Sequence, residues 1–140
     1  MWLERLAAHS STTSAYPFPF VDNELDFRPL LESIIRDKLR GRKHAEIAGC
    51  FQRGIAKGLS EAISELCAAH KVDTVALSGG VFQNDLLLRD LKNFLKAEPL
   101  EVWTNHVVPA NDGGISLGQA ALAAFATGFA CSNGRSGSSV

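Results

Sequence analysis

Two stretches of this sequence combine glycines with small polar residues in a way that suits phosphate binding. The first, Ser78-Gly79-Gly80-Val81-Phe82-Gln83-Asn84, follows the short apolar run Thr74–Leu77. Glycine allows a positive φ and lets a ligand approach the main chain closely. Leucines at helical spacing follow, so the free N–H groups and the positive end of a helix dipole are predicted to face the turn. An anion such as a phosphate could bind there.

The second stretch, Pro109-Ala110-Asn111-Asp112-Gly113-Gly114, predicts a similar turn before another helix. Asn and Asp favour turns, the paired glycines free the backbone, and apolar residues at helical spacing follow. The Asp112 carboxylate has two interpretations. It caps the helix, which is the more common role of a lone Asp at such a turn, or it holds a metal ion. Carboxylate oxygens suit Mg²⁺, whereas a mixed His and Asp set suits iron or another transition metal.

Other nucleotide-binding motifs are excluded by residues that the sequence lacks. A Walker A loop needs Gly-Lys-Ser/Thr, but Gly80 is followed by Val81 and Phe82. A dinucleotide-binding fingerprint needs G-x-G-x-x-G, which the stretch 78–84 does not supply. No Ser/His/Asp or Cys/His nucleophilic pair can be assembled from the spacing, so no catalytic residue is assigned. Taken alone, the first glycine turn is interpreted first as a purely structural turn.

Together, the two stretches resemble the C-terminal end of HypF, the family of carbamoyltransferases that mature NiFe-hydrogenases. The matching segments are Leu77–Asn84 and Val108–Ala120, in the family's order and at a compatible spacing. The resemblance extends over residues 1–125. The last domain of this family is related to the Kae1/TsaD proteins of tRNA threonylcarbamoyl-adenosine synthesis.

The resemblance implies a fold and a function. The fold is α/β, one lobe of an actin-like ATPase (ASKHA, Kae1-like) fold with a parallel or mixed sheet flanked by helices. The implied enzyme forms carbamoyl-adenylate from carbamoyl phosphate and ATP, and transfers the carbamoyl group to the C-terminal cysteine of a HypE-type acceptor protein. This chain would supply part of the nucleotide and metal site, and we expect the isolated chain to be inactive.

Carried over residue by residue, the resemblance also implies site residues. Gly79, Gly80 and Asn84 would contact the nucleotide, and Asp112 would ligate a metal ion beside its phosphates. Further candidates around the two turns are Ser78, Asn111, Gly113 and Gly114. The expected cofactors are ATP with Mg²⁺, and iron or zinc in the full-length protein.

The sequence also departs from the family pattern. The related proteins supply an HxxxH histidine pair, and no two of the four histidines here have that spacing. His106 lies close to Asp112 in the sequence, but it is interpreted as a surface or capping residue. The resemblance implies that the acylphosphatase-like domain, the zinc fingers and the YrdC-like domain, which the family carries before this region, lie outside these 140 residues. These domains are therefore expected partners, beside carbamoyl phosphate, ATP and the HypE-type acceptor.

Composition predicts one soluble domain. The chain has 140 residues, 46% of them hydrophobic, and a formal net charge of -1. This balance favours neither nucleic acid nor an acidic membrane surface as a partner. No apolar run reaches membrane-spanning length, so a cytoplasmic location is expected. The cysteines Cys50, Cys67 and Cys131 lack any CxxC pairing, which indicates reduced thiols rather than a zinc or disulfide site.

Hydrophobic periodicity predicts how the two turns are positioned. Helices are expected over residues 1–8, 26–39 and 43–70, followed by strand 74–77, a helix from about residue 84, and strand 100–104. A strand-helix-strand unit of this size implies a parallel crossover. Gly54 and Gly58 lie one helical turn apart and would allow a close crossing by another helix or by bound ligand, but packing in the core of the chain is the preferred interpretation. We expect one lobe over residues 1–127 and a flexible tail over 128–140.

Two alternative functions remain open at this stage. One is a Kae1/TsaD-like tRNA threonylcarbamoyl-transferase lobe, although Phe82-Gln83 and the run Gly113–Gln119 look more like HypF. The other is a non-catalytic interaction fragment. In that case the first helix and the aromatic-proline segment Tyr16–Phe20, which is expected to be an edge strand, would pair two copies of the chain.

Overall fold

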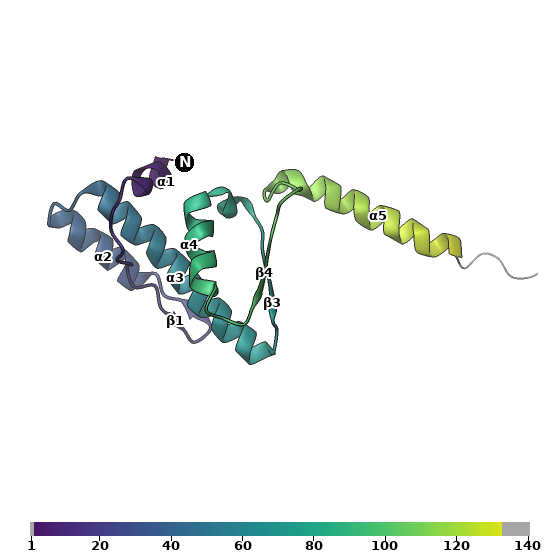
Figure 1. The fold of residues 1–140 in the computed structure, drawn as a ribbon, viewed down its shortest axis with the longest axis horizontal. Coiled ribbons are helices and arrows are strands. Elements are labelled where there is room, and N and C mark those ends of the chain that lie inside the picture. The colour runs from purple at the N-terminus through teal and green to yellow at the C-terminus, as the bar shows by residue number, and fades with distance from the viewer. Residues whose placement is uncertain (1, 133–140) are drawn as a thin grey trace, which may run out of the picture.

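A computed structural model describes residues 2–132 of the chain, and a single long helix lies at its centre. That helix, α3, packs against three other helices, α1, α2 and α4 (Figure 1). The elements in chain order are α1 (Trp2–Ala8), β1 (Phe20–Val21), β2 (Glu24–Leu25), α2 (Arg28–Leu39), α3 (His44–His70), β3 (Thr74–Leu77), the 3₁₀ turn η1 (Gly80–Gln83), α4 (Asp85–Leu95), β4 (Glu101–Thr104), the 3₁₀ turn η2 (Asp112–Gly114) and α5 (Ile115–Ser132).

The larger core cluster joins α3, α4 and the strands that flank α4. Its buried members are Ala56, Leu77, Leu87, Leu91 and Leu95. The leucines of α4 recur at three- and four-residue steps, so one face of the helix is apolar and packs inward. Leu91 and Leu95 are among the most deeply buried side chains of the described chain.

β3 and β4 form a two-stranded parallel sheet, with Thr74 opposite Glu101 and Leu77 opposite Thr104. Because α4 connects the two strands and packs with them in one cluster, the predicted strand-helix-strand unit is confirmed. The predicted α/β fold class is confirmed with it.

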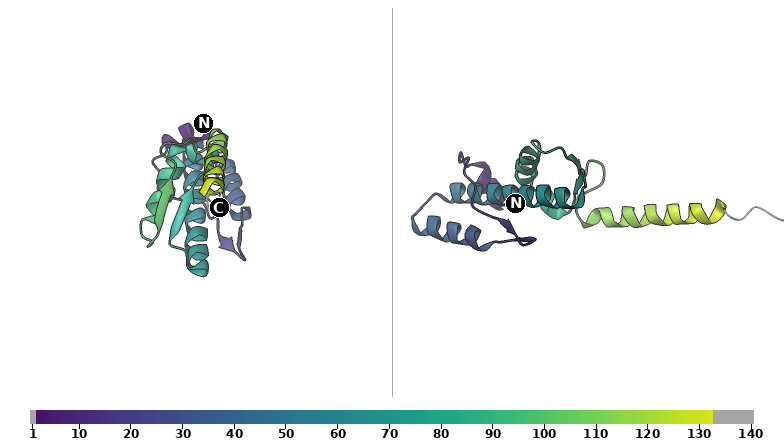
Figure 2. Two further views of the ribbon diagram at one scale, coloured as in Figure 1. Left: turned by 90° about the vertical axis from the view of Figure 1, so that its right-hand side faces the viewer. Right: turned by 90° about the horizontal axis from the view of Figure 1, so that it is seen from below.

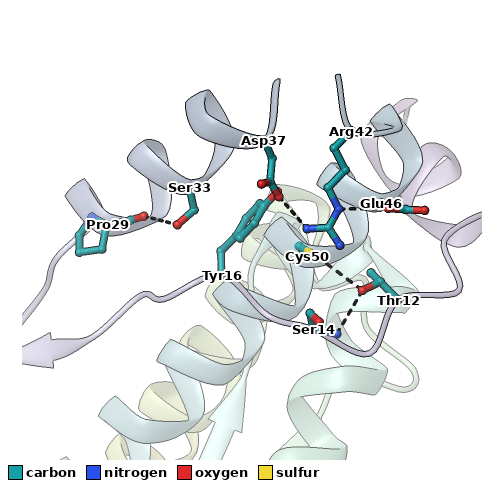
Figure 3. A network of polar contacts seen from close by, with 9 residues as sticks. All are labelled: Thr12, Ser14, Tyr16, Pro29, Ser33, Asp37, Arg42, Glu46 and Cys50. Atoms are coloured by element: carbon teal, nitrogen blue, oxygen red, sulfur yellow. Dashed lines mark hydrogen bonds and ion pairs between the residues drawn. The ribbon is translucent and has the colours of Figure 1, made fainter. Parts of the chain in front are cut away.

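A smaller core cluster joins α2 and α3 to the segment that follows α1. Its buried members are Tyr16, Leu30 and Cys50. Polar contacts surround it (Figure 3): the Tyr16 hydroxyl donates to Asp37 Oδ2 over 2.6 Å, and Arg42 donates to the same oxygen over 2.6 Å. Arg42 also donates to Glu46 over 3.1 Å. These contacts tie the loop before β1 to the end of α2 and the start of α3.

Gly54 and Gly58 of α3 pack in the core, as preferred, and the element that crosses them is the extended segment 16–18. A Cβ at Gly54 would lie 2.6 Å from the Tyr16 carbonyl oxygen, and one at Gly58 would lie even closer to that of Phe18. Such contacts are too close for any side chain, so both positions require glycine. The predicted strand over 16–20 is mostly absent, since β1 is only Phe20–Val21. Tyr16 is buried against α3 and is not exposed for pairing with a second copy.

The C-terminal helix is longer than predicted. α5 continues to Ser132, five residues past the expected boundary at 127, and it extends away from the other elements (Figure 2). The rest of the predicted tail, 133–140, lies outside the described residues.

Cys50 is buried and Cys67 is half-buried, both as free thiols. Cys131 is outside the residues whose side chains are described. Among the residues searched, no helix has the length and apolar character needed to span a membrane.

Candidate functional site

The two glycine-containing stretches follow neighbouring parallel strands. β3 ends at Leu77 and β4 at Thr104, and these two residues are paired in the sheet. Because the strands run in the same direction, stretches 78–84 and 105–114 leave from the same end of the sheet (Figure 1). Open α/β sheets bind their ligands outside the carboxyl ends of the strands. This end of the sheet is therefore the candidate site.

The backbone of the first glycine turn has free space beside it. Gly79 has a φ of 111°, a conformation that residues with a side chain rarely adopt, so glycine is needed there. Gly80 begins η1, and the first N–H groups of a helical turn have no partner within it. A Cβ added at Gly79 or Gly80 would meet nothing within 4 Å. The glycines are therefore not explained by crowding inside the chain.

The amino end of α4 was predicted to have free N–H groups, but two of these groups have hydrogen-bond acceptors within the chain. The helix begins at Asp85, as predicted, but η1, which starts at Gly80, lies between it and Gly79. Asn84 is only 7% exposed, and its Oδ1 accepts a 3.0 Å hydrogen bond from the Leu87 amide. The Leu86 amide donates to Glu4 Oε1 of α1 over 3.5 Å. Two amide groups at the amino end of α4 thus already have acceptors within the chain.

The second turn is capped by Asn111, not by Asp112. Asn111 Oδ1 accepts a 3.0 Å hydrogen bond from the Gly113 amide. A Cβ at Gly114 would lie 2.8 Å from the Pro109 carbonyl oxygen, so close packing explains that glycine. Asp112 is exposed, and its carboxylate has no hydrogen bond or ion pair with other described residues. Its carboxylate is therefore available for a ligand.

A metal ion would need ligands from outside the described chain. Across the residues that the structure describes, no group of three His, Cys, Asp or Glu side chains could hold one. One carboxylate does not make a metal site. His106 is exposed and its Nε2 lies 3.3 Å from the Thr104 hydroxyl, which also accepts a 3.2 Å hydrogen bond from Lys92. Asp112 thus stands as a single candidate ligand.

Comparison with known protein families shows which family contains this pair of glycine turns. Residues 1–119 match the family model described as "Carbamoyltransferase, Kae1-like Domain, second subdomain". The chain belongs to the HypF carbamoyltransferase family. The match includes both glycine turns and Asp112, and the family suggested by the two motifs is confirmed.

Individual HypF proteins support this assignment. Carbamoyltransferase HypF of Rhodobacter capsulatus is 34% identical over 89% of this chain. A crystal structure of full-length HypF "in the phosphate- and nucleotide-bound form" superimposes with a TM-score of 0.77, at 33% identity over 86% of the chain. The predicted Kae1-like fold is thereby confirmed. The chain spans 16% of the length of each of these two HypF proteins.

The tRNA-modifying relatives are less similar. The tRNA N6-adenosine threonylcarbamoyltransferase of Clostridium botulinum (strain 657) is 27% identical over 81% of this chain, which covers 37% of that protein. The lower identity agrees with the HypF-like character of the residues around both glycine turns.

Sequence reasoning does not find three contacts at this end of the sheet. Asn84 was assigned only to the nucleotide, although an Asn directly before a leucine-rich helix is also a typical N-cap. The contact of Glu4 with Leu86 spans 82 residues, and no local pattern could have indicated it. Asn111 is one of the further candidates around the two turns, and the structure shows it capping the second turn.

Proposed function

We propose that this chain acts as part of a HypF-type carbamoyltransferase. The proposed reaction forms carbamoyl-adenylate from carbamoyl phosphate and ATP and passes the carbamoyl group to the C-terminal cysteine of a HypE-type acceptor protein. The chain contributes part of the nucleotide and metal site. Because it spans 16% of the length of the Rhodobacter capsulatus protein and of the full-length HypF structure, we expect the remaining site residues, and the turnover, to depend on the other HypF domains.

The parallel pairing of β3 with β4 is the observation that supports this proposal most strongly. The pair Leu77 and Thr104 brings both glycine turns to one end of the sheet, within a match to a carbamoyltransferase family. If the strands were antiparallel, the turns would lie at opposite ends. A single triphosphate could not then reach both.

In the proposed site each turn has a separate task. The backbone N–H groups at Gly79 and Gly80 bind phosphate oxygens, since the open space beside them admits a ligand to the main chain. Asp112 supplies one carboxylate to Mg²⁺, which neutralises charge on the phosphates in phosphoryl and adenylyl transfer. Asn84 holds the first turn in place through its cap on α4 while its amide group faces the nucleotide. Gly113 and Gly114 allow the tight turn that presents Asp112.

A chimeric enzyme tests the proposal. Residues 1–119 of this chain would replace the matching segment of HypF from Rhodobacter capsulatus. Carbamoylation of a HypE-type acceptor would be followed by mass spectrometry of its C-terminal cysteine. We expect the chimera to transfer the carbamoyl group, and to lose more than about a hundredfold of the transfer rate when Asp112→Asn is introduced, because a charge that stabilises the phosphates is removed.

The chimera carries its own folding control. Carbamoyl phosphate hydrolysis belongs to another domain of the proposed enzyme, so its rate should be the same before and after the Asp112→Asn substitution. Glu65→Gln, an exposed change on α3 outside both turns, serves as the matched variant and should transfer normally. Normal transfer by the Asp112→Asn chimera would exclude the proposed role of this carboxylate.

The Kae1/TsaD-like role is the second candidate function. It is favoured by the similarity to the Clostridium botulinum enzyme, at 27% identity. The same segment would be placed in a tRNA threonylcarbamoyltransferase, and modified adenosine would be measured in tRNA. Activity there, together with an inactive HypF chimera, would favour this second function.

A further inference from the structure

Three side chains form a hydrogen-bonded row that starts on α4 and ends beyond β4. Lys92 Nζ of α4 donates to the Thr104 hydroxyl over 3.2 Å, and the same hydroxyl oxygen lies 3.3 Å from Nε2 of His106. Thr104 is the last residue of β4 and is paired with Leu77, the last residue of β3. The row therefore ends at the edge of the sheet that holds the candidate site.

The row lies on the same side of the sheet as the first glycine turn. Leu77 is buried in the core cluster with α4, and Phe82 of η1 packs against that cluster. Paired residues of neighbouring strands project from the same face, so Thr104 also faces α4, in agreement with its contact to that helix. Gly79 and His106 are each the second residue after this strand pair, and neighbouring strands lie about 4.8 Å apart. The chain thus brings His106 to the side from which the first turn leaves.

The two glycine-containing stretches supply little positive charge for a phosphate. Residues 78–84 and 105–114 include no Lys or Arg, and His106 is their only residue besides Asp112 with an ionisable side chain. The Asp112 carboxylate is negative and would meet a phosphate only through a metal ion. Phosphoryl and adenylyl transfer depend on donors and cations around the phosphates. Lys92 and His106 bring such groups to this end of the sheet.

One donor of the row is unused. Nδ1 of the exposed His106 has no hydrogen bond or ion pair within the described part of the chain. Because Lys92 donates to the Thr104 oxygen, the hydroxyl can give its own proton to Nε2, which puts the proton of a neutral ring on Nδ1. A protonated ring carries a proton there as well. Nδ1–H is then free to donate to an anion.

We propose that His106 binds a phosphate oxygen of the nucleotide through Nδ1–H, and that Lys92 positions the imidazole through the Thr104 hydroxyl. His106 is the binding residue because it is the exposed end of the row, whereas Lys92 and Thr104 are partly buried. A cation at the start of a chain of hydrogen bonds polarises the groups that follow it, which strengthens the donor at the far end. This inference rests on the proposed function and adds residues to its nucleotide site.

Kinetics of the chimeric enzyme test the role of His106. We expect His106→Ala to raise the KM for ATP at least about tenfold, because a hydrogen bond to a charged group is lost. The inhibition constant of adenosine as a competitor of ATP should not change, since adenosine has no phosphates. His106→Asn places an amide N–H at the position of Nδ1 and should restore most of the affinity. His106→Gln, whose amide lies at the position of Nε2, should not restore it.

A double-mutant cycle tests the positioning by Lys92. Lys92→Met retains the aliphatic part of the side chain and should raise the KM for ATP severalfold. The same substitution should have almost no further effect in the His106→Ala background, because residues that act through one contact are not additive. The matched control is Lys96→Met on the same helix. Lys96 is exposed and donates to Asn93, so this variant should have the unsubstituted KM.

The outcomes separate this inference from the proposed function. An unsubstituted chimera that transfers no carbamoyl group would overturn the proposed function and this inference with it. A chimera that transfers normally, and whose KM for ATP is unchanged by His106→Ala, would overturn the inference alone. A parallel rise in the KM for ATP and the inhibition constant of adenosine would also overturn it, because it would assign His106 to the structure of the turn. Full additivity of Lys92→Met and His106→Ala would overturn the positioning role.

Discussion

The hydroxyl of Tyr16 donates a 2.6 Å hydrogen bond to Asp37, 21 residues further along the chain (Figure 3). Tyr16 is only 7% exposed, and burial together with this carboxylate raises its pKa. The contact fixes the segment before β1 onto the end of α2. The stability of the smaller core cluster therefore depends on a polar pair as well as on apolar packing.

Removing that hydroxyl should destabilise the chain. Tyr16→Phe retains the ring in the cluster but leaves Asp37 with one hydrogen-bond donor fewer. We expect a loss of about 1–2 kcal/mol in the free energy of unfolding. Urea denaturation followed by circular dichroism measures it. Phe18→Tyr, which adds a hydroxyl in the same segment without a partner, is the reciprocal control. An unchanged midpoint for Tyr16→Phe would show that the hydrogen bond contributes nothing.

The same carboxylate predicts a dependence of stability on pH. Hydrogen bonds from Tyr16 and then from Arg42 hold the pKa of Asp37 below its ordinary value. The folded state therefore binds this proton less readily than the unfolded state. The stabilisation is complete above the ordinary Asp pKa of about 3.9, and is lost as the pH falls through the lower folded value. Urea midpoints measured from pH 7 down to pH 2 should show this loss.

Asp37→Asn provides the control for the pH series. The variant should be less stable at pH 7 and should show a flatter decline toward acid, because its side chain no longer titrates. Glu65→Gln, at an exposed position of α3, should reproduce the slope of the unsubstituted chain. Parallel slopes for Asp37→Asn and the unsubstituted chain would contradict the assignment to Asp37.

Gly58 should tolerate no side chain. Gly58→Ala places a Cβ in steric conflict with the Phe18 carbonyl oxygen, so the crossing segment must move away from α3. We expect a loss of about 1–3 kcal/mol, although alanine is the better helix former. Glu65→Ala on the same helix should cost little. A Gly58→Ala variant as stable as the unsubstituted chain would mean that the crossing segment moves without cost.

Asn84 has a structural role that can be separated from its proposed nucleotide contact. Asn84→Ala removes the cap on α4 and should cost about 1 kcal/mol of stability. Asn84→Asp retains a capping oxygen and should cost less. In the chimeric enzyme, we expect Asn84→Asp to raise the KM for ATP, since a carboxylate would repel the phosphates. Equal KM values for the unsubstituted and Asn84→Asp chimeras would limit Asn84 to capping.

The sequence predicted most of the elements because their signals are local. The leucine spacing after Asn84 indicated the start of α4, and alternation over 101–104 indicated β4. The two glycine turns could be placed at one end of the sheet because a strand-helix-strand unit makes its strands parallel. Tertiary contacts between distant segments were not predictable. Two examples are the contact of Glu4 with Leu86 and that of Tyr16 with Asp37. Both depend on how whole helices pack, and the spacing of nearby residues does not indicate them.

Two features of the candidate site, the capping residue of the second turn and the turn η1, could not be predicted for a different reason. Asn111 and Asp112 are adjacent and equally suited to capping, so composition alone could not decide which of them accepts the hydrogen bond. The 3₁₀ turn η1, which starts at Gly80 and precedes α4, is not predicted from the sequence because short tight turns have no apolar period of their own. Both details affect the candidate site, since one exposes the Asp112 carboxylate and the other separates Gly79 from the amino end of α4.

The small size of the sheet has a practical consequence. In the part of the chain that the structure describes, β3 and β4 pair only with each other, so the outer flank of each strand has hydrogen-bonding groups with no strand beside them. Such flanks are templates for pairing with other molecules. Concentrated samples should therefore precipitate through residues 74–77 and 101–104. Purification at low protein concentration, or co-expression with a polypeptide that adds neighbouring strands, should improve the yield of soluble material.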